Sequence, residues 1–407
     1  MEHRAWSREL LSILQFNDLK LFGLKTLWHI SRILLGLVFM FSGFVKGIDP
    51  WGSAYKFTDY FNAWDLDVLT SLAFPLGILL SAFEFMIGLA LTLNVFTTLF
   101  SIAALVFMAF FTGLTLIIVI YNPVTDCGCF GDALKLTNWQ TFIKNIFLLA
   151  FALLVFKYRK RVQSSTQSIV RIVFLAITMF AFAYLAGYSF HHLPIIDFLP
   201  YKVGTNIPQA MTVPENAPKD VYENIFYYKN RKTGEEKKFT EQNYPWQDSL
   251  NWEFVSMDSK RIQKGYEPSI QNFTIETAKG DDVKDFFLQD PGYTFIFVVY
   301  DQGKADLSGM QTVQALSEYA QSNRMNFIGL TSAETSQTEQ FKNVNKLGFD
   351  FFNADQTTLK TMVRSNPGLL LIKGGVILDK WHFNDFPSLE ELQHELEFFG
   401  KRTPETK

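Results

Sequence analysis

Long apolar runs separated by short polar connections dominate the first half of the chain. Five of them approach or reach the roughly 20 residues that an α-helix needs to cross a bilayer. They cover about residues 27–45, 69–93, 96–120, 139–156 and 169–190. A soluble core rarely supplies five such runs in succession, so the pattern predicts an α-helical membrane bundle with five transmembrane helices.

From about residue 266 the pattern changes, because short apolar strands alternate with amphipathic helices. In chain order, the predicted elements are strand Tyr293–Tyr300, helix Leu307–Asn323, strand Asn326–Thr331, helix Thr335–Leu347, short helix Leu359–Arg364, a strand pair around the hairpin turn Gly374-Gly375, and helix Leu389–Phe399. This is the order β-α-β-α-β-β-α, which predicts an α/β domain.

That order resembles the thioredoxin fold. Asn366-Pro367 stands where the fold carries a cis-proline before a strand. Thioredoxins place a Cys-x-x-Cys pair after the first strand of this unit, but this domain contains no cysteine and cannot itself carry out dithiol exchange. We expect the face near Pro367 to dock an extended polypeptide or a redox partner. The other interpretation is a fold retained for stability.

The stretch between the membrane region and the α/β domain is rich in Pro, Asn and Lys. Within it, Asn224–Phe239 predicts a β-hairpin with a turn at Lys232-Thr233-Gly234. The predicted domains are therefore a cytoplasmic N-terminal segment at 1–26, a four-helix membrane domain at 27–160, a fifth transmembrane helix with its flanks at 161–195, a linker with a small β-containing spacer at 196–265, and a thioredoxin-like domain at 266–407.

Lysine and arginine near the ends of the apolar runs predict the orientation in the membrane. Cations precede the first run and follow the fourth, at Arg4, Arg8, Lys20, Lys25, Lys157, Arg159, Lys160 and Arg161. Both of these ends are therefore predicted to face the cytoplasm. The prediction is a multi-pass protein of the inner (cytoplasmic) membrane, with a cytoplasmic N-terminus and a periplasmic C-terminal domain.

Composition narrows the function. The 407 residues carry a net charge of -3, which gives no case for nucleic acid binding. The five apolar runs make membrane lipid the expected surrounding. The chain has two cysteines, Cys127 and Cys129. One pair cannot form a disulfide framework, so its position matters. It lies in the connection after the third run, which the orientation places outside the cytoplasm, where thiols can be oxidised.

Cys127-Gly128-Cys129 is predicted to be a redox pair. A disulfide between cysteines two positions apart closes a small, strained ring and is labile and oxidising. Gly128 relaxes the backbone enough for closure. Inert thiols or a static disulfide form a second interpretation. A metal site is a third, but it needs further ligands and no other Cys or His lies nearby in sequence, so no metal is predicted.

Polar residues inside the apolar runs are candidates for a site. Glu84 lies near mid-membrane, where a charge costs about 3 kcal/mol and usually has a partner, on a helix face of small residues (Gly77, Ser81, Gly88). Arg32 and Lys46, near the two ends of the first run, are candidates to pair with Glu84 or to fix an anionic ligand head group. A structural ion pair or snorkelling at the interface is the alternative.

Lys144 and Asn145 lie within two turns of the start of the fourth run, at the depth of the cysteine connection. A nearby ammonium lowers the pKa of a thiol and makes it nucleophilic. Lys144 and Asn145 are therefore predicted to support the cysteines, with interface snorkelling of Lys144 as the alternative.

Several of these motifs resemble the DoxX/MauE membrane family: Arg32-x-x-x-Gly36, Phe41-Ser42-Gly43-Phe44-Val45-Lys46, Glu84 and Cys127-Gly128-Cys129-Phe130-Gly131. The resemblance covers about residues 25–160. It implies a four-helix unit and a role linked to methylamine utilisation, periplasmic disulfide formation or quinone-linked redox. The arrangement with a long extracytoplasmic tail is similar to DoxX-like proteins of Bacteroidetes.

Two hypotheses of function follow. In the first, Cys127 and Cys129 exchange electrons with a periplasmic thiol protein and with a small carrier, a quinone, held near Glu84, and the chain is a component of a thiol-disulfide or quinone-linked oxidoreductase. The cysteine-free domain presents the partner. In the second, the chain is a non-catalytic membrane scaffold or assembly factor for envelope proteins.

Overall fold

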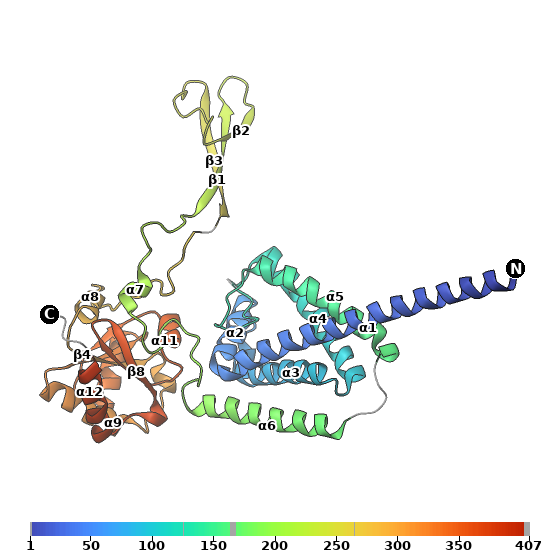
Figure 1. Cartoon of the computed structure of the whole chain (residues 1–407). Coiled ribbons are helices and arrows are strands. Elements are labelled where there is room, and N and C mark those ends of the chain that lie inside the picture. Colours follow the sequence, from blue (N-terminus) through green and yellow to red (C-terminus); the bar gives the residue numbers. More distant parts are fainter. Residues whose placement is uncertain (1, 125, 163–167, 264, 403–407) are drawn as a thin grey trace.

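The structure is a computed structural model that describes residues 2–124, 126–162, 168–263 and 265–402, without the side chains of residues 2–22, 161, 162, 401 and 402. It comprises a helical bundle, a small antiparallel sheet and an α/β domain (Figure 1). Some cations behind the orientation prediction lie outside the described side chains: Arg4, Arg8, Lys20 and Arg161.

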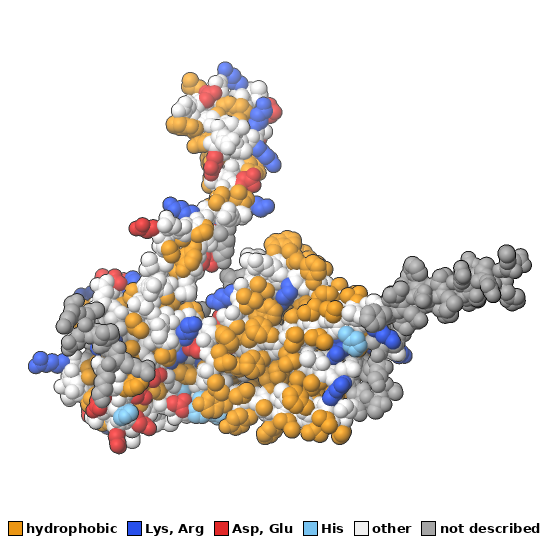
Figure 2. All heavy atoms as spheres, in the orientation of Figure 1, with side chains coloured by type: hydrophobic (Ala, Val, Ile, Leu, Met, Phe, Trp, Pro, Cys, Tyr) orange, Lys and Arg blue, Asp and Glu red, His pale blue; other side chains and the backbone are white. Residues whose placement is uncertain are grey.

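Five helices form the bundle: α1 (Glu2–Ile48), α3 (Ala73–Leu93), α4 (Thr97–Tyr121), α5 (Asn138–Val162) and α6 (Ile169–His191). Each contains a stretch long and apolar enough to cross a membrane, which confirms the predicted five helices. Their shared core is built from small and branched side chains such as Leu35, Ile87 and Ala152. Their outer faces carry exposed leucine, isoleucine and phenylalanine (Figure 2), as suits contact with lipid.

Helices α1 and α3 pack with their backbones almost touching. A Cβ added at Gly43 would lie 2.4 Å from the Phe85 amide nitrogen, and one at Gly88 would lie 2.3 Å from the Met40 amide nitrogen. Small residues allow such close approach between membrane helices. This contact fixes the register in which α1 and α3 present their polar side chains to each other.

The acidic connection between the first two apolar runs is mostly helical. It contains helix α2 (Pro50–Ala63) and the 3-10 helix η1 (Asp67–Leu72). Asp49 caps α2 by accepting a hydrogen bond from the Gly52 amide, and Pro50 occupies the first turn, where its missing N–H costs nothing. Helix α2 was overlooked because it is too short and too polar to stand out beside the transmembrane runs.

The small sheet has strand order β2-β1-β3, formed by β1 (Val221–Asn230), β2 (Glu236–Thr240) and β3 (Trp252–Gln263). The antiparallel pairing of β1 with β2 confirms the predicted hairpin, whereas β3 was not predicted. The sheet projects away from the rest of the molecule (Figure 1), and the short helix α7 (Ile207–Met211) precedes it.

The C-terminal domain has a five-stranded sheet in the order β6-β5-β4-β7-β8. Its elements are α8 (Lys284–Leu288), β4 (Tyr293–Val299), η2 (Gln302–Lys304), α9 (Met310–Ser322), β5 (Asn326–Thr331), α10 (Thr335–Asn345), β6 (Phe351–Asn353), α11 (Gln356–Met362), β7 (Gly368–Lys373), β8 (Val376–His382), η3 (Phe383–Asp385) and α12 (Leu389–Arg402). Strands β4, β5 and β6 run parallel, and β7 and β8 are antiparallel to their neighbours. The thioredoxin-like α/β fold is confirmed.

Both faces of this sheet carry an apolar core, one containing Ile296 and Leu370 and the other containing Phe297 and Leu371. Strand alternation places successive residues on opposite faces, which explains why buried strands read as continuous apolar runs. The Asn366-Pro367 bond is cis, as the sequence predicted, and Pro367 is buried. The short edge strand β6 was missed.

The close contact of α1 with α3 is testable by adding one methyl group. Gly43→Ala should lower the free energy of unfolding by about 1–3 kcal/mol, because the new Cβ has backbone atoms in its way. Gly113→Ala in α4 is the matched control, since nothing lies within 4 Å of its Cβ position. Thermal unfolding of both variants in detergent measures the difference; equal melting temperatures would contradict the packing.

Candidate functional site

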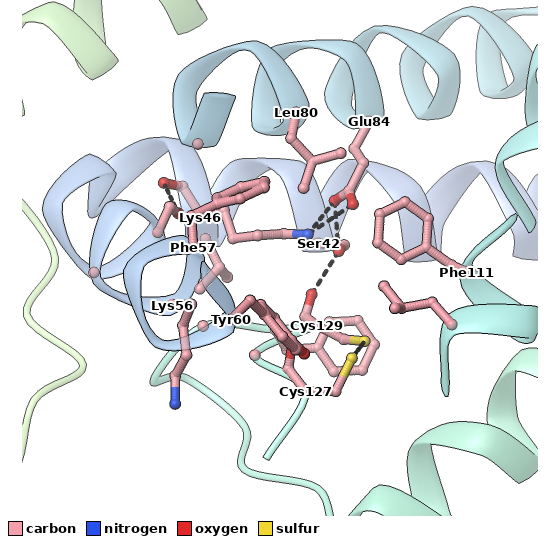
Figure 3. A pocket seen from close by; sticks show the side chains of 18 of the residues that line it. Ser42, Lys46, Lys56, Phe57, Tyr60, Leu80, Glu84, Phe111, Cys127 and Cys129 are labelled. Atoms are coloured by element: carbon pink, nitrogen blue, oxygen red, sulfur yellow. Dashed lines mark hydrogen bonds and ion pairs between the residues drawn. The ribbon is translucent and has the colours of Figure 1, made fainter. Parts of the chain in front are cut away.

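A cavity of about 240 Å³ lies at the end of the bundle that carries the cysteine connection. Its walls come from α1, α2, α3, α4, α5 and residues 127–132 (Figure 3). At the roughly 30 Å³ that a water takes in the liquid, it has room for about eight waters or one small aromatic ring system. Most of the lining is apolar, and aromatic side chains supply much of it: Phe39, Phe57, Phe61, Phe107, Phe110, Phe111 and Phe130.

Contacts of residues 126, 127 and 129 tie the cysteine connection to helices α1 and α2. Asp126 pairs with Lys56 of α2 at 2.9 Å. The Tyr60 hydroxyl donates to the Cys127 carbonyl at 3.0 Å, and the Ser42 hydroxyl lies 2.7 Å from the Cys129 carbonyl. Two of these anchors lie on α2, the helix that the sequence analysis missed.

Gly128 has a φ of +65°, a left-handed conformation that glycine adopts without strain. The Gly131 amide donates to the Gly128 carbonyl at 3.1 Å and closes a tight turn. A side chain at position 128 would also approach Lys56, whose Cγ lies 3.0 Å from the added Cβ position. The glycine between the cysteines therefore sets the turn that brings their side chains together.

The Cys127 and Cys129 sulfurs lie 3.0 Å apart and are joined by a hydrogen bond; both cysteines are free thiols and half-buried. This hydrogen bond lowers the pKa of Cys129 to about 6; burial opposes that shift and Lys144 assists it. The same hydrogen bond, together with burial, raises the pKa of Cys127 well above the ordinary thiol value. The contact between the sulfurs therefore favours the ionised form of Cys129 and the protonated form of Cys127.

Lys46 is the ion-pair partner of Glu84. Lys46 contacts both carboxylate oxygens of Glu84, at 2.7 and 2.6 Å, and the two side chains are only 9% and 5% exposed. Ser42 lies 2.7 Å from Glu84 Oε2 as well as from the Cys129 carbonyl. A continuous polar chain thus runs from the ion pair, through Ser42, to the backbone of the cysteine connection (Figure 3).

Arg32, the other candidate partner of Glu84, lies elsewhere. Its guanidinium donates to the carbonyls of Leu91 and Thr92 near the last turn of α3 and stacks on the Trp28 ring. The last turn of a helix leaves its carbonyls without the usual helical partners; the Leu91 carbonyl also accepts from the Asn94 amide at 3.1 Å. Arg32 therefore caps α3 at the far end of the bundle and does not contact Glu84.

Lys144 and Asn145 both line the cavity. The Lys144 ammonium lies 4.3 Å from the centre of the Phe130 ring, beside the cysteines. Asn145 is buried and donates to Thr115 Oγ1 at 3.2 Å and to the Phe111 carbonyl at 3.4 Å, which ties α5 to α4. The structure thus places Lys144 close to the thiols and gives Asn145 a place in the helix packing.

Arg364 of the thioredoxin-like domain also reaches this region, which the sequence did not reveal. Arg364, at the start of the loop that leads to Pro367, contacts Asp49 at 2.9 Å and Asp132 at 3.0 Å, and its side chain is 4% exposed. Burial acts to lower the pKa of Arg364, but the two carboxylates outweigh it and raise the pKa further. No local pattern marks Arg364, because its partners lie far away in sequence.

Among the described residues, no group of three or more His, Cys, Asp or Glu side chains is placed to hold a metal ion. The donors around Cys127 and Cys129 are a lysine, a tyrosine and a serine. Their chemistry suits hydrogen bonding and proton exchange with the thiols.

The opposite pKa shifts of Cys127 and Cys129 predict how their alkylation depends on pH. Alkylation of the protein by iodoacetamide should begin with a thiolate that titrates near pH 6, because the hydrogen bond from Cys127 holds Cys129 ionised. In Cys127→Ala that bond is gone, and the midpoint should move up toward the ordinary value of about 8.5.

Rates of alkylation between pH 5 and pH 9, followed by mass spectrometry, measure the two midpoints. Lys144→Gln should also raise the midpoint of Cys129, whereas the exposed Lys202→Gln is a control that should leave it in place. A midpoint above pH 8 in the unaltered protein would contradict the assignment.

Comparisons with known proteins agree with this architecture. Residues 24–158 match the family model of the methylamine utilisation protein MauE, and residues 222–264 match a domain of unknown function (DUF8463). No curated protein sequence matches the chain. A similar solved structure is described as the "C-terminal domain of putative thiol-disulfide oxidoreductase from Bacteroides thetaiotaomicron"; it is 15% identical with a TM-score of 0.27, and the similarity covers 32% of this chain and 93% of that chain.

The MauE match spans α3, α4 and most of α1 and α5, together with Glu84, Cys127 and Cys129. The thioredoxin-like assignment of the last domain rests on its own strand order and its cis-proline. The chain is thus a multi-pass membrane protein in which residues 24–158 match the MauE family model and the last domain has a thioredoxin-like fold.

Proposed function

We propose that this protein carries out thiol–disulfide exchange at the membrane through Cys127 and Cys129. The observation that supports it best is the pairing of the two thiols, 3.0 Å apart with a hydrogen bond between them, on the wall of a cavity that also holds the Lys46–Glu84 pair. Strongly shifted pKa values in a cavity are typical of reactive groups.

In the oxidising direction, a thiolate of a partner protein attacks the Cys127–Cys129 disulfide. A mixed disulfide forms at Cys127, and Cys129 leaves as the thiolate, because the thiol of lower pKa is the better leaving group. The second thiol of the partner then attacks the mixed disulfide. The partner ends as a disulfide, and Cys127 and Cys129 end as thiols that carry the two electrons.

Reoxidation needs an acceptor for two electrons and two protons. The cavity fits the head group of a quinone, since it combines phenylalanine walls with the ammonium groups of Lys46 and Lys144, which suit carbonyl oxygens. When bound, a quinone would take up both electrons and both protons and leave as quinol.

The residues around the cavity are placed to move a proton. The Ser42 hydroxyl has one hydrogen but lies 2.7 Å from two acceptors, Glu84 Oε2 and the Cys129 carbonyl. The single hydroxyl hydrogen of Ser42 can be shared between these two acceptors or can turn from one to the other. Ser42 is therefore proposed to link Glu84 to the thiol site, and Lys46 holds the Glu84 carboxylate in place.

The proposed location is the inner membrane, with the cysteine connection and the thioredoxin-like domain on the periplasmic side. Both lie at the same end of the bundle, since Arg364 contacts Asp132. Cations gather at the opposite end, at Arg32, Lys157, Arg159, Lys160 and Arg171. This distribution supports a cytoplasmic N-terminus by the positive-inside rule.

A periplasmic thiol protein is the proposed partner, and docking near Pro367 stays a prediction. Pro367 is buried, and Arg364 contacts the membrane domain. A partner would therefore have to approach the loop of residues 364–367 from the side that does not face the membrane domain. The scaffold hypothesis stays the alternative and predicts that the thiols never form a covalent link to a partner.

Single cysteine variants distinguish these hypotheses. In Cys129→Ser the proposed attachment point remains, and the Cys127 thiolate can attack the disulfide of an oxidised partner, which releases one partner thiolate. Because Cys129 is no longer there to resolve this link, mixed disulfides with envelope proteins should accumulate in cells, at least tenfold above the unaltered protein. Cys127→Ser should accumulate few, because it lacks the proposed attachment point. Non-reducing gels of acid-quenched, alkylated cells measure both, and the double serine variant is the control.

Covalent partners on neither single variant, with both proteins present in the membrane at normal levels, would contradict exchange and favour the scaffold. Equal trapping by the two variants would contradict the assignment of Cys127 as the residue that meets the partner.

A further inference from the structure

The contact between the thioredoxin-like domain and the membrane domain centres on one buried arginine. Arg364 Nε lies 3.1 and 3.0 Å from the two carboxylate oxygens of Asp49, and Nη2 lies 2.9 Å from Asp49 Oδ2 and 3.0 Å from Asp132 Oδ2. Its Nη1 donates to the Lys360 carbonyl within its own domain at 2.6 Å. The guanidinium is thus fully engaged and joins three separate pieces of chain.

The two carboxylates that Arg364 joins belong to the two walls of the thiol site. Asp132 ends the turn that begins at Cys127, three residues after Cys129. Asp49 is the cap of α2, the helix whose Lys56 and Tyr60 hold Asp126 and the Cys127 carbonyl. Arg364 therefore links Asp132, at the C-terminal end of the cysteine turn, to the N-cap of α2. The N-terminal end of the turn is held by Lys56 and Tyr60 of the same helix.

Neighbouring contacts hold the arginine in this place. The Tyr55 hydroxyl of α2 donates to the Tyr300 hydroxyl at 2.9 Å. Lys360 and Arg364 lie over the Tyr55 ring, at 5.0 and 5.2 Å from its centre. A Cβ at Gly52 would lie 2.9 Å from the Arg364 guanidinium, so the glycine leaves room for it.

The thioredoxin-like domain makes these contacts with the segment after β4 and with the loop of the cis-proline. Tyr300 follows strand β4, where thioredoxins carry their cysteine pair, and Arg364 begins the loop of the cis-proline. In the thioredoxin fold, the dithiol lies between these two segments. In this chain they are turned toward the membrane domain, on the side where Cys127 and Cys129 lie.

We propose that Arg364 is a positioning residue of the thiol site, and that the cysteine-free domain completes this site by clamping the Cys127–Cys129 turn against α2. This proposal rests on the proposed function in one respect, namely that Cys127 and Cys129 are the pair that is oxidised and reduced. The clamp holds the two sulfurs together in advance, so it lowers the entropy lost on forming their disulfide and favours the oxidised pair.

The experiment is a redox equilibrium of the full chain in detergent. The protein is equilibrated with mixtures of reduced and oxidised glutathione, quenched with acid and alkylated with a large maleimide, and the oxidised fraction is read from gel shifts. Arg364→Gln should lower the equilibrium constant for oxidation of the pair about tenfold, which is a shift of about 30 mV toward easier reduction.

Two further variants separate positioning from general stability. Asp132→Asn leaves the Arg364–Asp49 contacts intact, so the domain stays docked while the cysteine turn is released, and it should lower the constant about as much as Arg364→Gln. The double variant should be no worse than either single one, since both remove the same link. Arg364→Lys keeps the charge but loses the planar fork that reaches both carboxylates, so about a threefold loss is expected.

Arg261→Gln is the matched control, because Arg261 pairs with Asp220 and Glu267 on the projecting sheet, at 3.7 and 4.0 Å; its constant should equal that of the unaltered protein. Unchanged constants in folded Arg364→Gln and Asp132→Asn would overturn the proposal. A shifted constant in these variants, in a protein whose thiols never react in cells, would support the clamp and contradict the proposed function.

Discussion

A buried ion pair, Lys46 with Glu84, organises the membrane domain. Removing one partner of a buried pair leaves a charge without compensation and costs about 3–5 kcal/mol, so the two side chains must meet. They meet because Gly43 and Gly88 let α1 and α3 approach until an added Cβ would touch backbone. The same register places Ser42 between Glu84 and the Cys129 carbonyl.

The thiol site is then assembled outward from this pair. Ser42 holds one end of the cysteine pair by its backbone, and Tyr60 holds the other. Burial raises the pKa of Tyr60, so its hydroxyl keeps the hydrogen that it donates. Arg364 adds the last fixed point from a domain that begins far along the chain. Each anchor restricts the turn, and together they keep the Cys127 and Cys129 sulfurs in contact.

Much of the fold was predictable because its signals are local. A transmembrane helix can be recognised from its own length and apolarity. Strands such as Asn326–Thr331 can be recognised from a short apolar run between polar ends. Cys127, Cys129, Glu84 and Lys46, which line one cavity, could be selected as candidates for a similar reason: a thiol pair in a polar turn and charges within apolar runs differ from their neighbours in sequence.

What the sequence did not reveal depends on distant partners. Helix α2 has a mixed composition and gains its place from the cap at Asp49 and from packing on α3. Strand β3 pairs with β1, which no local pattern signals. Arg364 reads as one more surface cation until the fold brings Asp49 and Asp132 to it. The choice between Arg32 and Lys46 as partner of Glu84 also needed the helix register.

The central claim is that Cys127 and Cys129 cycle between thiol and disulfide in the membrane. The most direct measurement is their redox state in intact cells, trapped with acid, alkylated with a large maleimide with and without prior reduction, and counted by gel shift. The account predicts a mixed population that moves toward the disulfide with oxidant or active respiration and toward thiols when respiration is blocked. Thiols that stay wholly free, or a disulfide that never responds, would contradict it.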